Sequence, residues 1–269
     1  MTTTALTSTQ TRQLDELAEI VRFHAPLVAF TGAGISTESG IPDYRGPHGL
    51  WTTGNQKPFT YDDFMNNPEA RREWWRRLPE RLAEVEARQP NAGHQALSRI
   101  ERAYVMLAIV TQNIDGLQQE AGSDPARVIE LHGSSRMIRC TRCGEVYLAR
   151  EILEVYGGSP EPPPCPNCGG ILKSGTIAFG EPVPPDALRV AFAVAEQAGV
   201  MLVVGSTLLV NPAARVPAMA KEAGAYLAIL NKGETGLDGA ADLRVDAPAG
   251  QALEYLAGRL LSATPGSDH

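Results

Sequence analysis

Five short runs of apolar residues constrain the fold of this chain more than any other feature. They cover residues 27–30, 105–110, 128–131, 200–204 and 225–230 and are bounded by polar or turn-forming residues. Strands that are apolar almost without interruption are typical of parallel sheets buried on both faces. Helical patterns at 94–103, 186–198 and 212–223 separate several of the runs, and an amphipathic helix is expected at 10–24. The pattern predicts an α/β fold with a parallel sheet.

Two long stretches interrupt this alternation of strands and helices. Residues 60–88 have a helical pattern rich in arginine, and we interpret them as a solvated helix whose two tryptophans pack inward. Residues 134–178 contain all four cysteines and a turn-forming segment at 157–164. We therefore expect a second, small and irregular module that is held together by something other than a hydrophobic core.

Charge and hydropathy argue against several classes of function. With a net charge of −7 over 269 residues, the chain lacks the basic field that general nucleic-acid binding requires. No apolar run reaches the roughly 18 residues of a membrane-spanning helix, and the first residues do not resemble a signal peptide. We expect a cytoplasmic protein that binds neither nucleic acid nor membrane. The strong excess of arginine over lysine suggests a bacterial source with a GC-rich genome.

Four cysteines form the most specific ligand pattern in the sequence. They make two Cys-x2-Cys pairs separated by 21 residues, namely Cys140, Cys143, Cys165 and Cys168. Two such pairs are typical of a zinc-ribbon-like module, in which four thiolates close the coordination sphere of a structural metal. Gly144 and Gly169 follow the pairs and permit tight turns that bring backbone amides toward the sulfurs. The alternatives are reduced cysteines without metal, a redox-active pair or an iron–sulfur cluster; zinc suits the pairs and glycines best.

A glycine-containing loop follows the first apolar run. Residues 32–36 carry half of the GxGxxG dinucleotide-binding pattern, with Thr37 in place of the third glycine. A strand that runs into such a loop and then into a helix lets the backbone approach a pyrophosphate. Further along, Asp43 and Arg45 bring a carboxylate and a cation to the same region. An ordinary loop with a surface ion pair explains these residues equally well.

Polar residues follow the second and third apolar runs at their carboxyl ends. Gln112, Asn113 and Asp115 come after the second run, and His132 comes directly after the third. Open α/β sheets place their ligands at this edge. A neutral histidine there is suited to accept a proton near neutral pH, so His132 is a candidate general base. The alternative is a packing role for His132, and His94 is expected to pack within its helix.

Together these motifs resemble the sirtuins, a family of NAD-dependent protein-lysine deacylases. The matching segments occur in the family's order and cover roughly residues 25–255. They are residues 32–36, 40–45, 90–94, 111–115, 130–133, 179–181, 204–208 and 231–233, with the two cysteine pairs. Tyr44 stands where many members have Phe, which is typical of the class often called class II.

The resemblance implies a fold of two parts. A Rossmann-type domain, with a parallel sheet and helices on both faces, is expected to comprise residues 1–45, 91–133 and 179–269. A smaller zinc-ribbon and helical domain is expected to comprise residues 46–90 and 134–178. NAD and an acyl-lysine peptide would meet in the cleft between the two domains, and zinc would be structural.

The resemblance also implies which residues bind NAD. The glycine loop would face the pyrophosphate through Gly32, Ala33, Gly34, Ile35 and Ser36. The adjoining cofactor loop would contribute Asp43, Tyr44, Arg45 and Trp51. The nicotinamide end, with its ribose, would contact Gln112, Asn113, Ile114, Asp115 and His132, and Asp115 would bind the carboxamide. The adenosine half would contact Gly205, Ser206, Thr207, Asn231, Lys232, Gly233 and Ala249.

For the substrate, the resemblance implies an acyl-lysine tunnel and a peptide groove. The tunnel would be lined by His132, Ile177 and Phe179, and the peptide would pair as an added strand between two loops. These loops contribute Phe179, Gly180, Glu181, Leu208, Leu209 and Val210. His132 and Asn113 would be the catalytic residues.

The implied chemistry consumes NAD and transfers no hydride. The acyl oxygen of lysine attacks C1′ as nicotinamide leaves, His132 accepts a ribose hydroxyl proton, and the products are lysine, nicotinamide and O-acyl-ADP-ribose. Acetyl is taken as the default acyl group. Succinyl specificity is not expected, because the Ala-Tyr-x-x-Arg pattern of desuccinylases is replaced by Thr-Tyr-Asp-Asp-Phe at 60–64. The alternatives are mono-ADP-ribosyl transfer, removal of longer acyl or lipoyl groups, and a non-catalytic module that binds NAD or ADP-ribose.

Overall fold

The computed structural model describes residues 5–43, 49 and 60–262. The larger part of the structure is built around a parallel sheet. Its strands are ordered β3-β2-β1-β7-β8-β9, and each neighbouring pair runs parallel. They are β1 (Leu27–Thr31), β2 (Met106–Thr111), β3 (Val128–Glu130), β7 (Val200–Val204), β8 (Tyr226–Leu230) and β9 (Leu243–Val245). The predicted α/β fold is confirmed, and all five apolar runs form strands.

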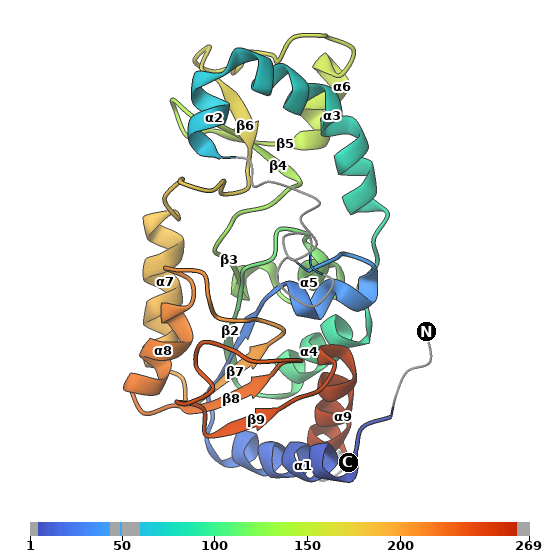
Figure 1. Ribbon diagram of the computed structural model, residues 1–269, viewed down its shortest axis with the longest axis vertical. Helices are drawn as coiled ribbons and strands as arrows, with labels where there is room; N and C mark the ends of the chain where they lie inside the picture. The colour runs from blue at the N-terminus through green and yellow to red at the C-terminus, as the bar shows by residue number, and fades with distance from the viewer. Residues whose placement is uncertain (1–4, 44–48, 50–59, 263–269) are drawn as a thin grey trace, which may run out of the picture.

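Helices cover both faces of this sheet (Figure 1). One face carries α1 (Ser8–Phe23), α4 (Ala92–Ala103) and α9 (Ala249–Leu261); the other carries α7 (Pro185–Glu196) and α8 (Arg215–Glu222). Successive residues of a strand point to opposite faces, so Ala29 packs on the first face and Val28 and Phe30 on the second. Burial on both faces explains why these strands are continuously apolar.

The strand order creates a switch point between β1 and β7. From β1 the chain proceeds to β2 and β3 on one side of the sheet, whereas β7, β8 and β9 extend it on the other side. Open parallel sheets bind ligands at such a point, outside the carboxyl ends of the strands. The glycine loop follows β1 and Gly205 follows β7, so both lie at this edge.

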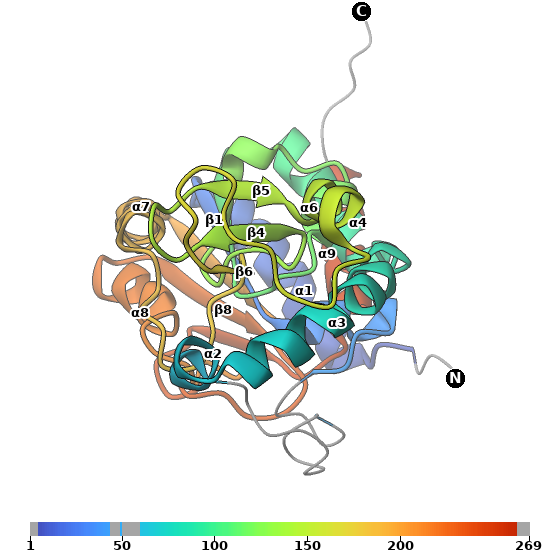
Figure 2. The ribbon, with the colours of Figure 1, turned by 90° about the horizontal axis from the view of Figure 1, so that it is seen from above.

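A second sheet and the helices that pack on it form the smaller part of the structure (Figures 1 and 2). The antiparallel sheet has the order β5-β4-β6, with β4 (Met137–Cys140), β5 (Val146–Leu148) and β6 (Leu172–Ser174). The helices are α2 (Tyr61–Asn66), α3 (Pro68–Glu86) and α6 (Ala149–Tyr156).

An apolar cluster joins these helices to the small sheet. Trp74 and Trp75 of α3 are buried and share it with Ile138, Ile152 and Leu172. The inward packing of the two tryptophans is thus confirmed. The expectation that the cysteine-containing module lacks a hydrophobic core is wrong, because the helical segment before it in the sequence supplies half of one.

Two local features differ from the sequence expectations. The helical stretch at 60–88 is two helices, because Asn67 ends α2 and its side chain caps α3, which begins with Pro68. The glycine loop leads into a 3-10 helix, η1 (Ala33–Ser39), rather than an α-helix. Two further short elements, α5 (Leu117–Glu120) and η2 (Pro125–Arg127), lie between β2 and β3.

Strand β9 and helix α9 lie outside the strands and helices predicted from the sequence. Helix α9 buries Leu253, Leu256 and Leu260 and packs against α1 and α4. Its apolar residues recur at helical spacing, so the signal for this helix was present in the sequence. Among the described helices, none is both long and apolar enough to cross a lipid bilayer.

Candidate active site

The glycine loop packs directly against the loop that follows β7. The amide of Gly34 donates to the carbonyl of Gly205 (2.8 Å), and the amide of Gly32 donates to the carbonyl of Val204 (3.0 Å). A Cβ atom at Gly34 would lie 2.7 Å from Gly205 Cα, and Gly205 itself has a φ of +61°. Neither position can hold a side chain without displacing backbone, so these glycines are what allows the two loops to meet at the switch point.

Ser36 is the centre of a buried polar cluster at this edge. Its hydroxyl donates to Asp115 Oδ2 (2.8 Å) and accepts from Asn113 Nδ2 (3.0 Å). Asp115 Oδ1 accepts from the amide of Leu117 (2.9 Å), so both carboxylate oxygens have donors despite the 7% exposure of this residue. The structure therefore brings together residues that follow β1 and β2, as the parallel arrangement predicted.

His94 belongs to the same cluster, although its position in the sequence predicted only packing within its helix. The ring is buried, and its Nδ1 accepts from the amide of Asn91 (3.4 Å). In the neutral ring Nε2 therefore carries the proton, and it lies 3.4 Å from Ser36 Oγ. Asn91 also donates to the carbonyl of Ile35 (2.7 Å) and thereby docks α4 on η1. The available signal was the spacing of Asn91 and His94, which is that of a helix capping box.

We expect His94 to make the protein less stable in acid. Burial lowers the pKa of His94 to about 4, although the negative charge of Asp115 acts in the opposite direction. Below the ordinary value of about 6.5 the unfolded chain binds a proton that folded His94 does not, so the free energy of unfolding decreases as pH falls. The full effect between about pH 6.5 and 4 is of the order of 3 kcal/mol.

Denaturant melts of the wild type and His94→Gln across this pH range measure the effect. The substitution should flatten the dependence of stability on pH, whereas His24→Gln, at an exposed histidine after α1, should leave it unchanged. Identical pH dependence in the wild type and His94→Gln would contradict the assignment.

His132 lies just beyond the carboxyl end of β3. Its Nδ1 is 3.0 Å from the carbonyl oxygen of Gln112. Because a carbonyl only accepts, Nδ1 carries the proton in the neutral ring and Nε2 keeps a lone pair. Burial lowers the pKa of His132, and the hydrogen bond to Gln112 opposes this effect. The ring is therefore neutral at pH 7, as a general base must be.

Side-chain hydrogen bonds join the ends of neighbouring strands at this edge. Gln112 Nε2, after β2, donates to Ser206 Oγ, after β7 (2.7 Å). Thr31 Oγ1 at the end of β1 donates to Thr111 Oγ1 at the end of β2 (2.8 Å). These bonds fix the positions of the loops that carry the candidate cofactor-binding residues.

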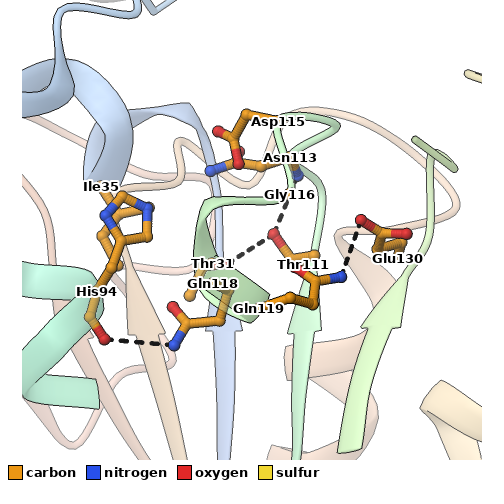
Figure 3. A pocket seen from close by; sticks show the side chains of 10 residues that line it. All are labelled: Thr31, Ile35, His94, Thr111, Asn113, Asp115, Gly116, Gln118, Gln119 and Glu130. Carbon is orange, nitrogen blue, oxygen red and sulfur yellow. Dashed lines mark hydrogen bonds between the residues drawn. The ribbon is translucent and has the colours of Figure 1, made fainter. Parts of the chain in front are cut away.

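A small cavity lies beside Asn113 and Asp115 (Figure 3). Its volume is about 10 Å³, which matches a single water molecule. His94, Gln118 and Glu130 also line it, and the buried Gln118 Oε1 on its wall has no hydrogen-bond partner within the described part of the chain. The polar cluster around Ser36 and Asp115 therefore continues through this cavity to Gln118 and Glu130.

The residues expected at the adenosine half lie in the loops after β7 and β8 and at the start of α9. Asn231 is 6% exposed, and its Nδ2 donates to the carbonyls of the next two residues (3.2 and 3.0 Å), which shapes the loop 231–233. Helix α9 begins at Ala249, and the amide of Gly250 donates to Glu38 Oε1 from η1 (3.1 Å). The glycine loop and α9 are therefore tied together.

The four cysteines lie together in the small module. Their sulfur atoms are all within 4.8 Å of one another, with Cys140 and Cys168 at 3.5 Å and Cys143 and Cys165 at 3.8 Å. A tetrahedral zinc ion with Zn–S bonds of about 2.3 Å separates its sulfurs by about 3.8 Å, whereas a disulfide needs about 2.05 Å. All four are free cysteines, so the donor set fits structural zinc.

The surroundings of the cysteines support the same site. Gly144 and Gly169 have φ values of +76° and +71°, which confirms the predicted tight turns. The amide of Arg142 donates to Cys140 Sγ (3.4 Å), and Tyr147 Oη lies 3.2 Å from Cys165 Sγ. Donors directed at the sulfurs stabilise thiolates and orient them for a metal.

Comparison with known proteins decides the family. The model of the Sir2 family matches residues 32–212. An NAD-dependent protein deacetylase of Pyrobaculum aerophilum is 43% identical over 251 residues, which cover 93% of this chain and 96% of that protein. A second, of Streptomyces coelicolor, is 42% identical over 234 residues, which cover 86% of this chain and 96% of that protein.

The chain belongs to the Sir2 family. Solved Sir2 structures share its fold and contain the expected ligands. One, of Sir2 with a p53 peptide and NAD⁺, has a TM-score of 0.77 and 35% identity over 92% of this chain and 96% of that one. Another, of a Sir2 homologue with ADP ribose, has a TM-score of 0.82 and 36% identity over 93% of this chain and 99% of that one.

The loops expected to hold the peptide in this Sir2-family chain expose large apolar side chains. Phe179 is 43% exposed and Leu209 is 61% exposed, whereas Leu208 is buried with a φ of +56°. The carbonyl of Phe179 accepts from the amide of Tyr61 at the start of α2 (2.8 Å). The carbonyl of Phe179 therefore already has a hydrogen-bond donor within the chain, which the sequence did not predict.

The loop that is expected to contact NAD lies partly outside the described residues. Tyr44, Arg45 and Trp51 lie outside the described residues. Asp43 is half-buried in the irregular segment that follows η1.

Proposed function

We propose that this Sir2-family chain removes acyl groups, with acetyl as the default, from lysine side chains of proteins and uses NAD as co-substrate. The main support is the position of His132. Its Nδ1 donates to the Gln112 carbonyl, so Nε2 can accept a proton at the carboxyl ends of the strands, where open parallel sheets bind ligands. Relatives named as NAD-dependent protein deacetylases and Sir2 structures with NAD⁺ and peptide support the same activity.

The proposed reaction proceeds in two stages. The acyl oxygen of lysine forms a bond to C1′ of the ribose as the bond to nicotinamide breaks. His132 Nε2 then accepts a proton from a ribose hydroxyl, and the 2′-oxygen attacks the acyl carbon. Addition of one water and departure of the amine give lysine and O-acyl-ADP-ribose. The low pKa of His132 keeps it neutral for this step.

The roles of the other residues are part of the same proposal. The close contact of the loops after β1 and β7 favours backbone binding of the pyrophosphate by residues 32–36, with residues 205–207 next to them at the adenosine half. Asn113, bonded to Ser36, orients the nicotinamide-side ribose, and Asp115 binds the carboxamide. The loop 231–233 and Ala249 hold the adenosine, and the loops around Phe179 and Leu209 hold the substrate.

The division into domains and the cellular setting are also proposals. Residues 1–45, 91–133 and 179–269 would form the Rossmann-type domain, and residues 46–90 and 134–178 the small domain. The separate apolar cluster around Trp75 supports this division. A cytoplasmic location is supported by four thiols that are not paired into disulfides, and a net charge of −7 argues against nucleic-acid partners.

Asp115→Asn tests the nicotinamide end. An amide retains one acceptor oxygen for Leu117 but replaces the other with a donor, so the fold should persist while recognition of the carboxamide weakens. We expect turnover to fall by about 10²-fold, the cost of losing one well-placed polar contact at a reacting group, with ADP-ribose binding largely kept. If calorimetry shows that a folded variant no longer binds ADP-ribose, Asp115 does not lie at the nicotinamide end.

Labelled NAD separates deacylation from ADP-ribosyl transfer. The purified chain is incubated with an acetylated peptide and NAD that carries label in its adenosine half. Label recovered in soluble O-acetyl-ADP-ribose supports the proposal. Label attached to protein would assign the chain to ADP-ribosyl transfer, and unconsumed NAD would assign it to binding alone.

A further inference from the structure

A buried ion pair lies beneath the loop that carries the proposed substrate contacts. Lys173 on β6 and Glu181 after the loop approach to 2.9 Å, with side chains that are 6% and 13% exposed. Among the ion pairs whose two residues are both described, each of the others has at least one side chain that is 29% exposed or more. The Lys173–Glu181 pair is therefore the one that solvent screens least.

Both partners also bind the backbone of the loop between them. Lys173 Nζ donates to the carbonyls of Ser174 (2.8 Å) and Thr176 (2.5 Å). Glu181 Oε2 accepts from the amide of Ala178 (2.9 Å), and the amide of Glu181 donates back to the Ala178 carbonyl (3.0 Å). The pair thus fixes both limbs of the loop 174–181 rather than one end of it.

The loop 174–181 is also hydrogen-bonded to His132, the proposed general base. The amide of Ile177 donates to the carbonyl of His132 (2.8 Å), so the position of the loop and that of His132 depend on each other. At the tip, Gly180 has a φ of +83° and completes a tight turn that presents Phe179. Phe179 is 43% exposed, as a residue that contacts substrate must be.

The Lys173–Glu181 pair is better suited to hold the loop 174–181 in one position than to stabilise the folded protein. Burial lowers the pKa of Lys173, and the carboxylate of Glu181 counteracts this effect. Taking two charges out of water offsets much of their attraction, so such a pair adds little net stability, whereas its directional bonds define one geometry. A loop that is already ordered loses less conformational entropy when it binds a peptide than a mobile loop does.

We propose that Lys173 and Glu181 form a positioning pair that holds the loop 174–181 in the shape that binds the acyl-lysine peptide. The proposal rests on the proposed deacylase function and adds that the pair sets affinity for the peptide rather than for NAD. Lys173 acts through the loop and does not contact the substrate itself, because its ammonium group already binds Glu181 and two backbone carbonyls.

Steady-state kinetics of Lys173→Met test the proposal. We expect the KM for an acetylated peptide to rise about 10- to 100-fold, with the KM for NAD and the affinity for ADP-ribose within about twofold of the wild type. Lys173→Arg, which keeps the charge and the donors, should recover most of the peptide affinity. The matched control is Lys221→Met on α8, whose carboxylate partner Asp242 also accepts a backbone amide, and it should leave both KM values unchanged.

Hydrogen exchange gives a readout that does not depend on activity. The amides of Ile177 and Ala178 should exchange faster in Lys173→Met, while those of β7 keep their protection. If Lys173→Met fails to fold, Lys173→Met/Glu181→Met removes both charges and avoids a lone buried carboxylate. A folded single or double variant with normal peptide KM and normal exchange in the loop would overturn the proposal. A wild type that is folded but deacylates nothing would instead overturn the proposed function.

Discussion

His132→Ala should abolish deacylation while leaving NAD binding intact. Loss of a general base typically costs about 10²–10⁴-fold in rate. The glycine loop and the loop 231–233 do not depend on the imidazole, so calorimetric binding of ADP-ribose should be within about twofold of the wild type. His24→Ala, at an exposed position, is the matched control and should change neither quantity.

The pH dependence of the wild type provides a second check on His132. Because burial lowers its pKa, the ring stays neutral at pH 7 and the acid limb of the rate profile should lie below pH 6.5. A packing role makes a different prediction, in which alanine lowers the melting temperature and weakens all ligands together. A stable His132→Ala protein with a near-normal deacylase rate would refute the catalytic assignment.

Cys165→Ser should remove the zinc and unfold the small module. Cys165 is 3% exposed and belongs to the apolar cluster of that module, so loss of the metal also disturbs the packing around Trp75. Structural zinc contributes about 10–16 kcal/mol of binding free energy in zinc-finger peptides, and this energy is folding energy. We expect one zinc per wild-type chain, no retained zinc in the variant and no deacylase activity.

Metal analysis combined with hydrogen exchange measures this result. Residues 137–174 should lose protection in Cys165→Ser, whereas β7 in the centre of the large sheet should keep it. Asn167→Ala is the control, because Asn167 lies next to Cys143 Sγ without being one of the four thiolates. Soluble, active wild-type protein without zinc would contradict the metal assignment.

The central strands of the fold were predictable because their burial is two-sided. A strand such as β7 has no polar face, and this leaves a continuous apolar run that few other structures explain. Strand β9 was not predicted because Arg244 stands between its two apolar residues, Leu243 and Val245, so the strand leaves no apolar run. Helix α9 showed a helical period, but its alanines and glycines dilute the contrast between its faces. The apolar core of the cysteine module was not predicted because much of it comes from α2 and α3, which lie before the module in the sequence.

Residues of the candidate site that directly follow parallel strands could be predicted from the sequence, because the carboxyl ends of parallel strands lie at the same edge of a sheet. That rule brought Ser36, Asn113 and Asp115 to one edge without any knowledge of packing. His94 was missed because the direction in which it points depends on how α4 docks against η1, and this is set by bonds from Asn91 to a distant loop. The Lys173–Glu181 pair depends in the same way on the path of the chain between its partners.

Product stoichiometry from the purified wild-type chain tests the central claim most directly. An acetylated peptide is incubated with and without NAD, and all products are quantified by mass spectrometry. We predict that each lysine freed is matched by one nicotinamide and one O-acetyl-ADP-ribose, and that no lysine is freed without NAD. Lysine freed without NAD and accompanied by acetate, or NAD consumed while the peptide stays acetylated, would contradict the account.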